Sequence, residues 1–175
     1  SPIRCTQNPT MGEEWRRGWH PEIIEQRGES EKVLVVGAGP AGLEAAMSLG
    51  QRGYEVALAD SGDGGGRAVC ESGLPGLASY KRVSDYRVGQ ITKLANVSFF
   101  PGSEMDRASV LEFGADQVLI ATGSSWRADG LGRATHAPIP GIADYAQCFT
   151  PDDIMAGQLP SADAVLVYDD DHYYM

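Results

Sequence analysis

The sequence predicts an α/β fold in which helices cover both faces of a parallel sheet, so that the domain has three layers. Two observations support this prediction. The short apolar runs VLVV at 33–36 and YEVALAD at 54–60 have the length and composition of strands. The segment between them places apolar residues at helical spacing. Strand, helix and strand therefore form one β-α-β unit, which implies parallel strands joined by a right-handed crossover.

The first elements follow in order along the chain. Residues 1–30 are polar, lack sustained periodicity and are interpreted as a connector. The run at 33–36 is continuously apolar, as expected for a strand that is covered on both faces. A helix then begins near Pro40 and ends at Gly53, because glycine commonly follows the last helical turn. Its apolar face consists of Leu43, Ala46, Met47 and Gly50.

The middle of the chain has weaker patterns. The stretch at 62–80 is rich in glycine, which is unfavourable inside regular elements, so it is expected to be a loop. A helix is expected at 84–95, and a short strand at 96–102. Residues 105–115 indicate a weak helix that leads into an apolar strand at 116–123.

Two elements are expected near the C-terminus. A short helix should begin with Thr150 as its N-cap and Pro151 at its first helical position, followed by acidic residues in its first turn. The apolar run AVLVY at 164–168 then has the pattern of a further strand.

The pattern G-x-G-x-x-G, formed by Gly37, Gly39 and Gly42, lies directly after the first strand and at the start of the helix. The first glycine permits a tight turn, the second lets the backbone approach a pyrophosphate, and the third lets helix and strand pack closely. Pro40 and Ala41 open the helix, whose first N–H groups and dipole favour an anion. These features predict a Rossmann-like domain of the FAD/NAD(P)-binding type that binds an adenine nucleotide.

Asp60 and Ser61 lie at the end of the second strand. There the Asp60 carboxylate can accept hydrogen bonds from both hydroxyls of an adenosine ribose. The same carboxylate would repel a 2′-phosphate, so NADP is disfavoured at this position.

Composition excludes several other functions. The 24 acidic residues outnumber the 14 basic ones and give a formal charge of −10, which argues against nucleic acid as a partner. No apolar run has the roughly 20 residues needed to cross a membrane. The three cysteines are widely spaced and odd in number, which fits a reducing compartment. No Ser-His-Asp or Cys-His set is apparent, so we assign no catalytic residue.

Two further motifs are similar to those of flavoproteins with two dinucleotide-binding domains. Ala121, Thr122 and Gly123 look like the Ala-Thr-Gly strand end that returns beside the nucleotide-binding unit in these proteins. The group of Gly65, Gly66 and Arg67 resembles the Gly-Gly-Arg that follows the ribose acid in the same superfamily.

Cys5 carries a more specific resemblance. It begins a Cys-x-x-Asn-Pro segment, which a Gly-Glu pair and then the Rossmann unit follow. This order resembles the family of trimethylamine, dimethylamine and histamine dehydrogenases, and more distantly the 2,4-dienoyl-CoA reductases. The sequences of both ends are most similar to those of histamine dehydrogenases. No residue in this chain distinguishes which amine is the substrate. The resemblance covers essentially the whole chain, which we expect to be part of a longer polypeptide.

The resemblance implies a cytoplasmic enzyme that oxidises a small amine at FMN in a TIM barrel outside this chain. Electrons would leave through a [4Fe-4S] cluster toward an electron-transferring flavoprotein or a similar acceptor. Cys5 would be the last of four thiolate ligands, and the other three would come from an upstream Cys-x-x-Cys-x-x-Cys run. This segment would bind ADP in place of FAD and perform no chemistry itself. We expect a homodimer with neither a nucleic-acid nor a membrane partner.

The resemblance also implies a division into domains. Residues 1–30 would be the connector from the FMN and iron-sulfur barrel domain, and residues 31–160 the ADP-binding Rossmann-like domain, incomplete at its C-terminal end. Residues 161–175 would begin a second, degenerate NAD(P)-binding-like domain.

In the reductases, the strand that corresponds to 164–168 is followed by a glycine-rich turn that binds NADPH. Here the positions of that turn hold Asp169, Asp170, Asp171, His172, Tyr173 and Tyr174. Three carboxylates would repel a pyrophosphate, and side chains with a Cβ would block the close backbone approach that glycine allows. We therefore expect no nicotinamide cofactor at this second unit.

Two alternatives stay open. The chain would be the FAD-binding segment of a 2,4-dienoyl-CoA reductase-like, NADPH-dependent enzyme if its domain holds FAD. It would be a non-catalytic nucleotide-binding module that acts only as a scaffold or docking surface, which an empty nucleotide site in the full-length protein would favour.

Overall fold

The computed structural model describes residues 5, 7–13, 20, 23–27, 31–142 and 147–169. The chain divides into two compact units, Ser1–Gly123 and Ser124–Met175. This division differs from the expected domain boundaries after residues 30 and 160. The expected boundaries come from the resemblance to larger enzymes, and they stay a prediction.

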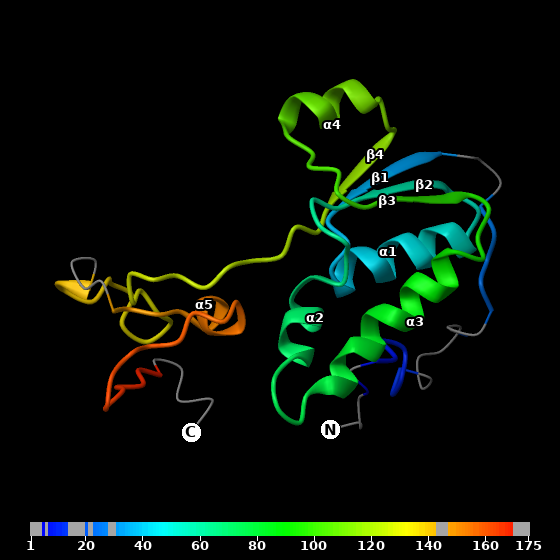
Figure 1. Ribbon diagram of the computed structural model, residues 1–175. Coiled ribbons are helices and arrows are strands. Elements are labelled where there is room, and N and C mark those ends of the chain that lie inside the picture. Colours follow the sequence, from blue (N-terminus) through cyan, green and yellow to red (C-terminus); the bar gives the residue numbers. More distant parts are fainter. Residues whose placement is uncertain are drawn as a thin grey trace. The chain divides into compact units, whose positions relative to one another are not determined.

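A parallel sheet of four strands forms the middle layer of the first unit (Figure 1). Its strands are β1 (Lys32–Val36), β2 (Glu55–Ala59), β3 (Val97–Phe100) and β4 (Gln117–Ile120), in the spatial order β3-β2-β1-β4. Val36 lies opposite both Ala59 and Ile120, so β1, β2 and β4 end at the same level. The predicted return of the Ala-Thr-Gly strand beside the first strand is confirmed.

Helices cover both faces of the sheet, which confirms the three predicted layers (Figure 1). On one face α1 (Pro40–Gln51) and α3 (Lys81–Ile91) enclose a buried core. On the other face, a smaller core of the sheet packs against residues in and around α4 (Arg107–Phe113). The first core includes Val33, Val35, Leu43 and Leu58, and the second includes Leu34, Val36 and Ala57. Because β1 contributes to both cores, it is buried on both faces as its apolar run predicts.

The ends of the helices follow the expected rules. Gly53, with φ +94°, follows the C-cap of α1 and lets the chain turn back into β2. Asp106 caps α4 by accepting a hydrogen bond from the Ser109 N–H. In the second unit, α5 (Pro151–Met155) begins with the predicted Thr150 cap, and Asp153 completes a capping box.

The prediction of a loop over 62–80 is wrong. Residues Gly66–Ser72 form helix α2, and Ala78–Tyr80 form a short 3-10 helix, η1. The glycines are concentrated at the start of this stretch, where Gly64, Gly65 and Gly66 have positive φ angles. Gly64 and Gly65 form the turn that leads into α2, which begins at Gly66, and the residues after Gly66 are compatible with a helix.

The expected strand at 164–168 is absent from the structure, although residues 164–169 are described. The side chains of this run are open to solvent, and Leu166 is 93% exposed. An apolar run becomes a strand only where a neighbouring strand supplies hydrogen-bond partners. The expected acidic and bulky turn lies largely outside the described residues, from Asp170 to Tyr174. Among the helices that the structure describes, none is long and apolar enough to span a lipid bilayer.

Candidate nucleotide-binding site

The turn between β1 and α1 is built so tightly that two of its positions accept only glycine. Gly37 has a φ of +102°, and a Cβ placed there would lie 2.4 Å from the carbonyl oxygen of Ala121. A Cβ on Gly42 would lie 1.7 Å from the carbonyl oxygen of Gly37. Both glycines therefore allow contacts within the protein, and the turn rests against the end of β4.

Gly39 is glycine for a different reason. Its φ of −69° is open to any residue, and a Cβ there would meet no atom within 4 Å. Gly39 is also the N-cap of α1, and it supplies no side-chain cap to the first helical N–H groups. The first turn, which contains Pro40 and Ala41, carries no acidic residue. This helix end thus offers backbone N–H groups and the positive end of its dipole to an anion.

Asp60 supports the same turn from the end of β2. Its Oδ2 accepts a hydrogen bond of 2.6 Å from the Ala38 N–H, and its Oδ1 accepts one of 2.8 Å from the Gly62 N–H. Each carboxylate oxygen keeps a second lone pair, so the group can still accept hydrogen bonds from ribose hydroxyls. Ser61 follows it in an exposed position.

The segment before α2 packs onto the glycine turn. The Gly65 N–H donates a 2.7 Å hydrogen bond to the carbonyl of Ala38. A Cβ on Gly66 would lie 3.0 Å from the Cα of Gly39, so its backbone borders the turn directly. Arg67 lies in the first turn of α2 and is half-buried.

The predicted binding residues thus come together at one edge of the sheet, where the carboxyl ends of β1, β2 and β4 meet. Ala121 lies against Gly37 and Gly42, and the Thr122 N would lie 2.9 Å from a Cβ on Gly37. Gly123, with a φ of +73°, has open space around it. Ligands of open α/β sheets bind at this edge, outside the carboxyl ends of the strands. The open face at Gly39 and the Asp60 carboxylate lie at this edge, and the identity and contacts of a nucleotide bound there stay a prediction.

Cys5 lies away from the turn, in the segment before residue 13. It is half-buried, and its Sγ accepts a hydrogen bond of 3.4 Å from the Gln7 N–H. This bond, with a second from the Asn8 backbone, lowers the pKa of the thiol and favours the thiolate that a metal ligand requires. No cluster of three or more His, Cys, Asp or Glu occurs among the described residues. Cys5 therefore fits one ligand position and would need the remaining ligands from elsewhere.

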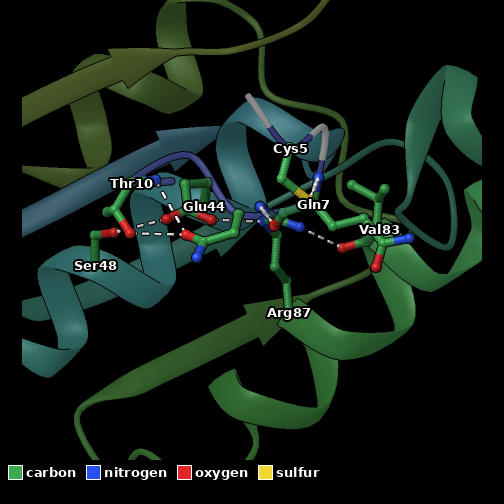
Figure 2. A network of polar contacts seen from close by, with 8 residues as sticks. Cys5, Gln7, Thr10, Glu44, Ser48, Val83 and Arg87 are labelled. Atoms are coloured by element: carbon green, nitrogen blue, oxygen red, sulfur yellow. Dashed lines mark hydrogen bonds and ion pairs between the residues drawn. The ribbon is translucent and has the colours of Figure 1, made fainter. Parts of the chain in front are cut away.

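A buried arginine that no sequence motif predicts joins the Cys5 segment to helix α1 (Figure 2). Arg87 in α3 is only 4% exposed. Its Nε donates to Glu44 of α1 at 2.6 Å, its Nη1 to the Val83 carbonyl at 2.8 Å, and its Nη2 to the Gln7 carbonyl at 3.1 Å. The sequence contained a signal for it, because Arg87 lies at helical spacing between the buried Val83 and Ile91.

A cavity of about 460 Å³ lies beside this network, between the segment 7–10, α1 and α3. Gln7, Glu44 and Arg87 line it, and none of its lining residues belongs to the glycine turn. The cavity is therefore separate from the candidate nucleotide site.

Known proteins match this chain over most of its length. A family model described as pyridine nucleotide-disulphide oxidoreductase matches residues 31–164. Dimethylamine dehydrogenase of Hyphomicrobium sp. (strain x) is 40% identical over 180 residues, which cover 99% of this chain and 24% of that protein.

Two solved structures are similar as well. Histamine dehydrogenase from Rhizobium sp. 4-9 has 51% identity and a TM-score of 0.87, with 98% of this chain and 25% of that chain covered. 6-Hydroxypseudooxynicotine amine oxidase from Pseudomonas geniculata N1 has 49% identity and a TM-score of 0.84, with 90% and 24% covered. The chain spans about a quarter of the length of these relatives.

Proposed function

The chain belongs to the pyridine nucleotide-disulphide oxidoreductase family and is homologous to part of dimethylamine and histamine dehydrogenases, and from this premise we propose that it is the ADP-binding part of an amine dehydrogenase. One observation carries the nucleotide-binding part of the proposal. Gly37 and Gly42 are fixed by packing, whereas Gly39 leaves open space at the uncapped N-terminus of α1. That combination is expected where a pyrophosphate approaches the backbone.

In the proposed complex, the N–H groups of the first turn of α1 bind the phosphates of ADP. Asp60 accepts hydrogen bonds from the ribose hydroxyls while it keeps its bonds to the turn, and its charge disfavours a 2′-phosphate. Gly65, Gly66 and Arg67 border the same space from α2. The chain's residues bind and orient the nucleotide, and none of them takes part in a chemical step.

Cys5 would supply one thiolate to a [4Fe-4S] cluster, with three upstream cysteines as the other ligands. The cluster would provide one-electron transfer between FMN in a barrel domain and an electron-transferring flavoprotein or similar acceptor. The substrate would be a small amine, such as histamine, trimethylamine or dimethylamine. We expect the protein to be a cytoplasmic homodimer that uses no nicotinamide cofactor at the acidic segment 169–174.

The bound nucleotide of the full-length protein tests this proposal. The protein is denatured after extensive dialysis, and the released nucleotide is identified by mass. ADP together with FMN is the expected result, in amounts that match the protein. A second measurement of iron and acid-labile sulfide tests the cluster.

A reductase is the second candidate, because the open space at Gly39 would admit the pyrophosphate of FAD as readily as that of ADP. Release of FAD would contradict the amine dehydrogenase proposal and favour an NADPH-dependent reductase. A full-length protein without nucleotide, iron or flavin would favour a non-catalytic scaffold.

A further inference from the structure

Arg87 makes three hydrogen bonds, and two of them reach outside its own helix α3. Only its bond to the Val83 carbonyl, at position i−4, lies within its own helix. The other two reach Glu44 on α1 and the backbone of Gln7, 80 positions earlier in the chain (Figure 2). An apolar residue of similar volume would fill the same buried position without the cost of removing a charge from water. The guanidinium therefore does what an apolar residue could not: it joins α1 and the Gln7 backbone to α3.

The planar guanidinium is suited to this task. It presents donors in fixed directions, so one side chain can hold a carboxylate and a carbonyl from different elements at the same time. A lysine has a single ammonium on a flexible stem and cannot reproduce the fork. Glu44 is held on its other oxygen by Ser48 at 3.2 Å, which orients it toward Arg87.

Both backbone groups of Gln7, its carbonyl and its N–H, make hydrogen bonds. Its carbonyl accepts the hydrogen bond from Arg87 Nη2, and its N–H donates to Cys5 Sγ. The position of Arg87 therefore sets the position of the donor to the sulfur (Figure 2). Hydrogen bonds to cluster sulfurs and the groups that orient them tune metal affinity and reduction potential.

We propose that Arg87 is a positioning residue that couples the nucleotide-binding helix α1 to the Cys5 segment. This inference rests on the function proposed above. The bound nucleotide would have a structural role: it would stabilise α1, and α1 would hold the Cys5 segment in place through Glu44 and Arg87. Linkage is reciprocal, so a nucleotide that stabilises the cluster is itself bound more tightly when the cluster is present.

Release of iron to a chelator from the full-length protein tests the coupling. The rate is measured with bound nucleotide and after its removal, for the unsubstituted protein and for R87M. In the unsubstituted protein, removal of the nucleotide should speed iron release. R87M should lose iron roughly 10-fold faster, as is typical when an outer-shell partner is removed, and its rate should no longer depend on the nucleotide.

The exposed Arg82 on the same helix provides the matched control. R82M removes an equal charge from α3 and should release iron at the rate of the unsubstituted protein. R87K is the variant to use if R87M fails to fold. Lysine keeps a positive charge opposite Glu44, but it cannot also hold the Gln7 carbonyl. R87K should unfold at a temperature close to that of R82M, release iron faster, and show a lower midpoint potential of the cluster.

Two results would overturn the proposal in different ways. The coupling through Arg87 is refuted, while the proposed function stands, if R87K and R87M release iron at the rate of R82M. The same holds if bound nucleotide slows iron release from these two variants as much as from the unsubstituted protein. If the unsubstituted full-length protein holds no iron, the proposed function fails and the coupling fails with it.

Discussion

Gly39 and Gly42 belong to one motif but are glycines for opposite reasons. A Cβ on Gly42 would collide with the Gly37 carbonyl, whereas one on Gly39 would enter open space. The motif therefore contains a requirement of the fold at Gly42 and, at Gly39, an open position that the proposed ligand would use. Single substitutions can separate the two.

We expect G39A to keep the fold and to lose nucleotide affinity. Alanine is compatible with the φ of −69° at this position. Its methyl group would occupy the space through which the phosphates approach the backbone. Loss of one charge-assisted hydrogen bond of about 1.5 kcal/mol would weaken ADP binding roughly tenfold. Titration calorimetry on the full-length protein after nucleotide removal measures the affinity.

Two glycine variants serve as controls for G39A. Gly89 lies in α3, also has open space at its Cβ, and is outside the turn, so G89A should bind ADP normally. G42A should instead lower the unfolding temperature, because the clash with the Gly37 carbonyl is inside the protein. Normal ADP binding by G39A would show that no phosphate approaches this position.

Asp60 should contribute to nucleotide affinity beyond its role in the turn. D60N keeps one carbonyl oxygen for a backbone N–H of the turn but loses the second acceptor and the charge proposed to bind the ribose hydroxyls, so ADP should bind roughly tenfold more weakly. D116N is the matched control, since Asp116 also accepts from a backbone N–H, that of Lys32 at the start of β1. Equal affinities for ADP in the two variants would contradict a ribose contact at Asp60.

At the scale of elements, local patterns were sufficient where each element contains its own signals. The sequence predicts β1 from its apolar run, the end of α1 from Gly53 and the start of α5 from Thr150, because periodicity and caps are local properties. It does not predict helix α2, because the glycines at and before its start lower the average helix propensity of the stretch. It predicts a strand at 164–168, but a strand also needs a neighbour, which local sequence does not specify.

Helix α4 should depend on its cap in a pH-dependent way. Hydrogen bonds from Ser109, first from its side chain and then from its N–H, lower the pKa of Asp106 below its usual value. The stabilisation is therefore complete above the unfolded pKa and is lost as the pH falls through the folded pKa, in the region below about pH 4. Hydrogen exchange of residues 107–113 should show D106A less protected than the unsubstituted protein at pH 7.

D106N distinguishes the cap from the charge. Asparagine still accepts a hydrogen bond at the N-cap but does not titrate in this range. Protection of α4 in D106N should stay close to the original at pH 7 and should change little on acidification. A pH dependence of local protection in D106N equal to that of the unsubstituted protein would assign the effect to other carboxylates.

At the scale of the whole molecule, the sequence predicts which segments meet at the candidate nucleotide site but not what joins them to Cys5. The glycine turn and Asp60 follow from a motif whose spacing is fixed by local geometry. Arg87 and Gln7 are brought together only by the folded arrangement of α3 and the N-terminal segment. No local pattern specifies that contact, although a charged residue on the apolar face of α3 indicates that it needs a buried partner.

The outer edge of the sheet predicts how this chain behaves when it is expressed alone. Strand β4 pairs with β1 on one side, and no described strand pairs with its other side. Val118, Leu119 and Ile120 are all exposed, with Ile120 at 68%. An exposed apolar edge strand is a template for pairing with another chain. We expect the 175-residue chain to associate reversibly, with an average mass in sedimentation experiments that rises with concentration.

I120K should shift that equilibrium toward the monomer, because a lysine on an edge strand opposes pairing with a second edge. L111K is the matched control. Leu111 is 70% exposed, but it lies on helix α4, whose backbone N–H and C=O groups bond within the helix and cannot pair with a strand of another chain. Equal effects of the two substitutions would indicate association through general apolar contact. If the unsubstituted chain stays monomeric at high concentration, the edge of β4 is protected from pairing. Association is assigned to that edge only if I120K lowers it and L111K does not.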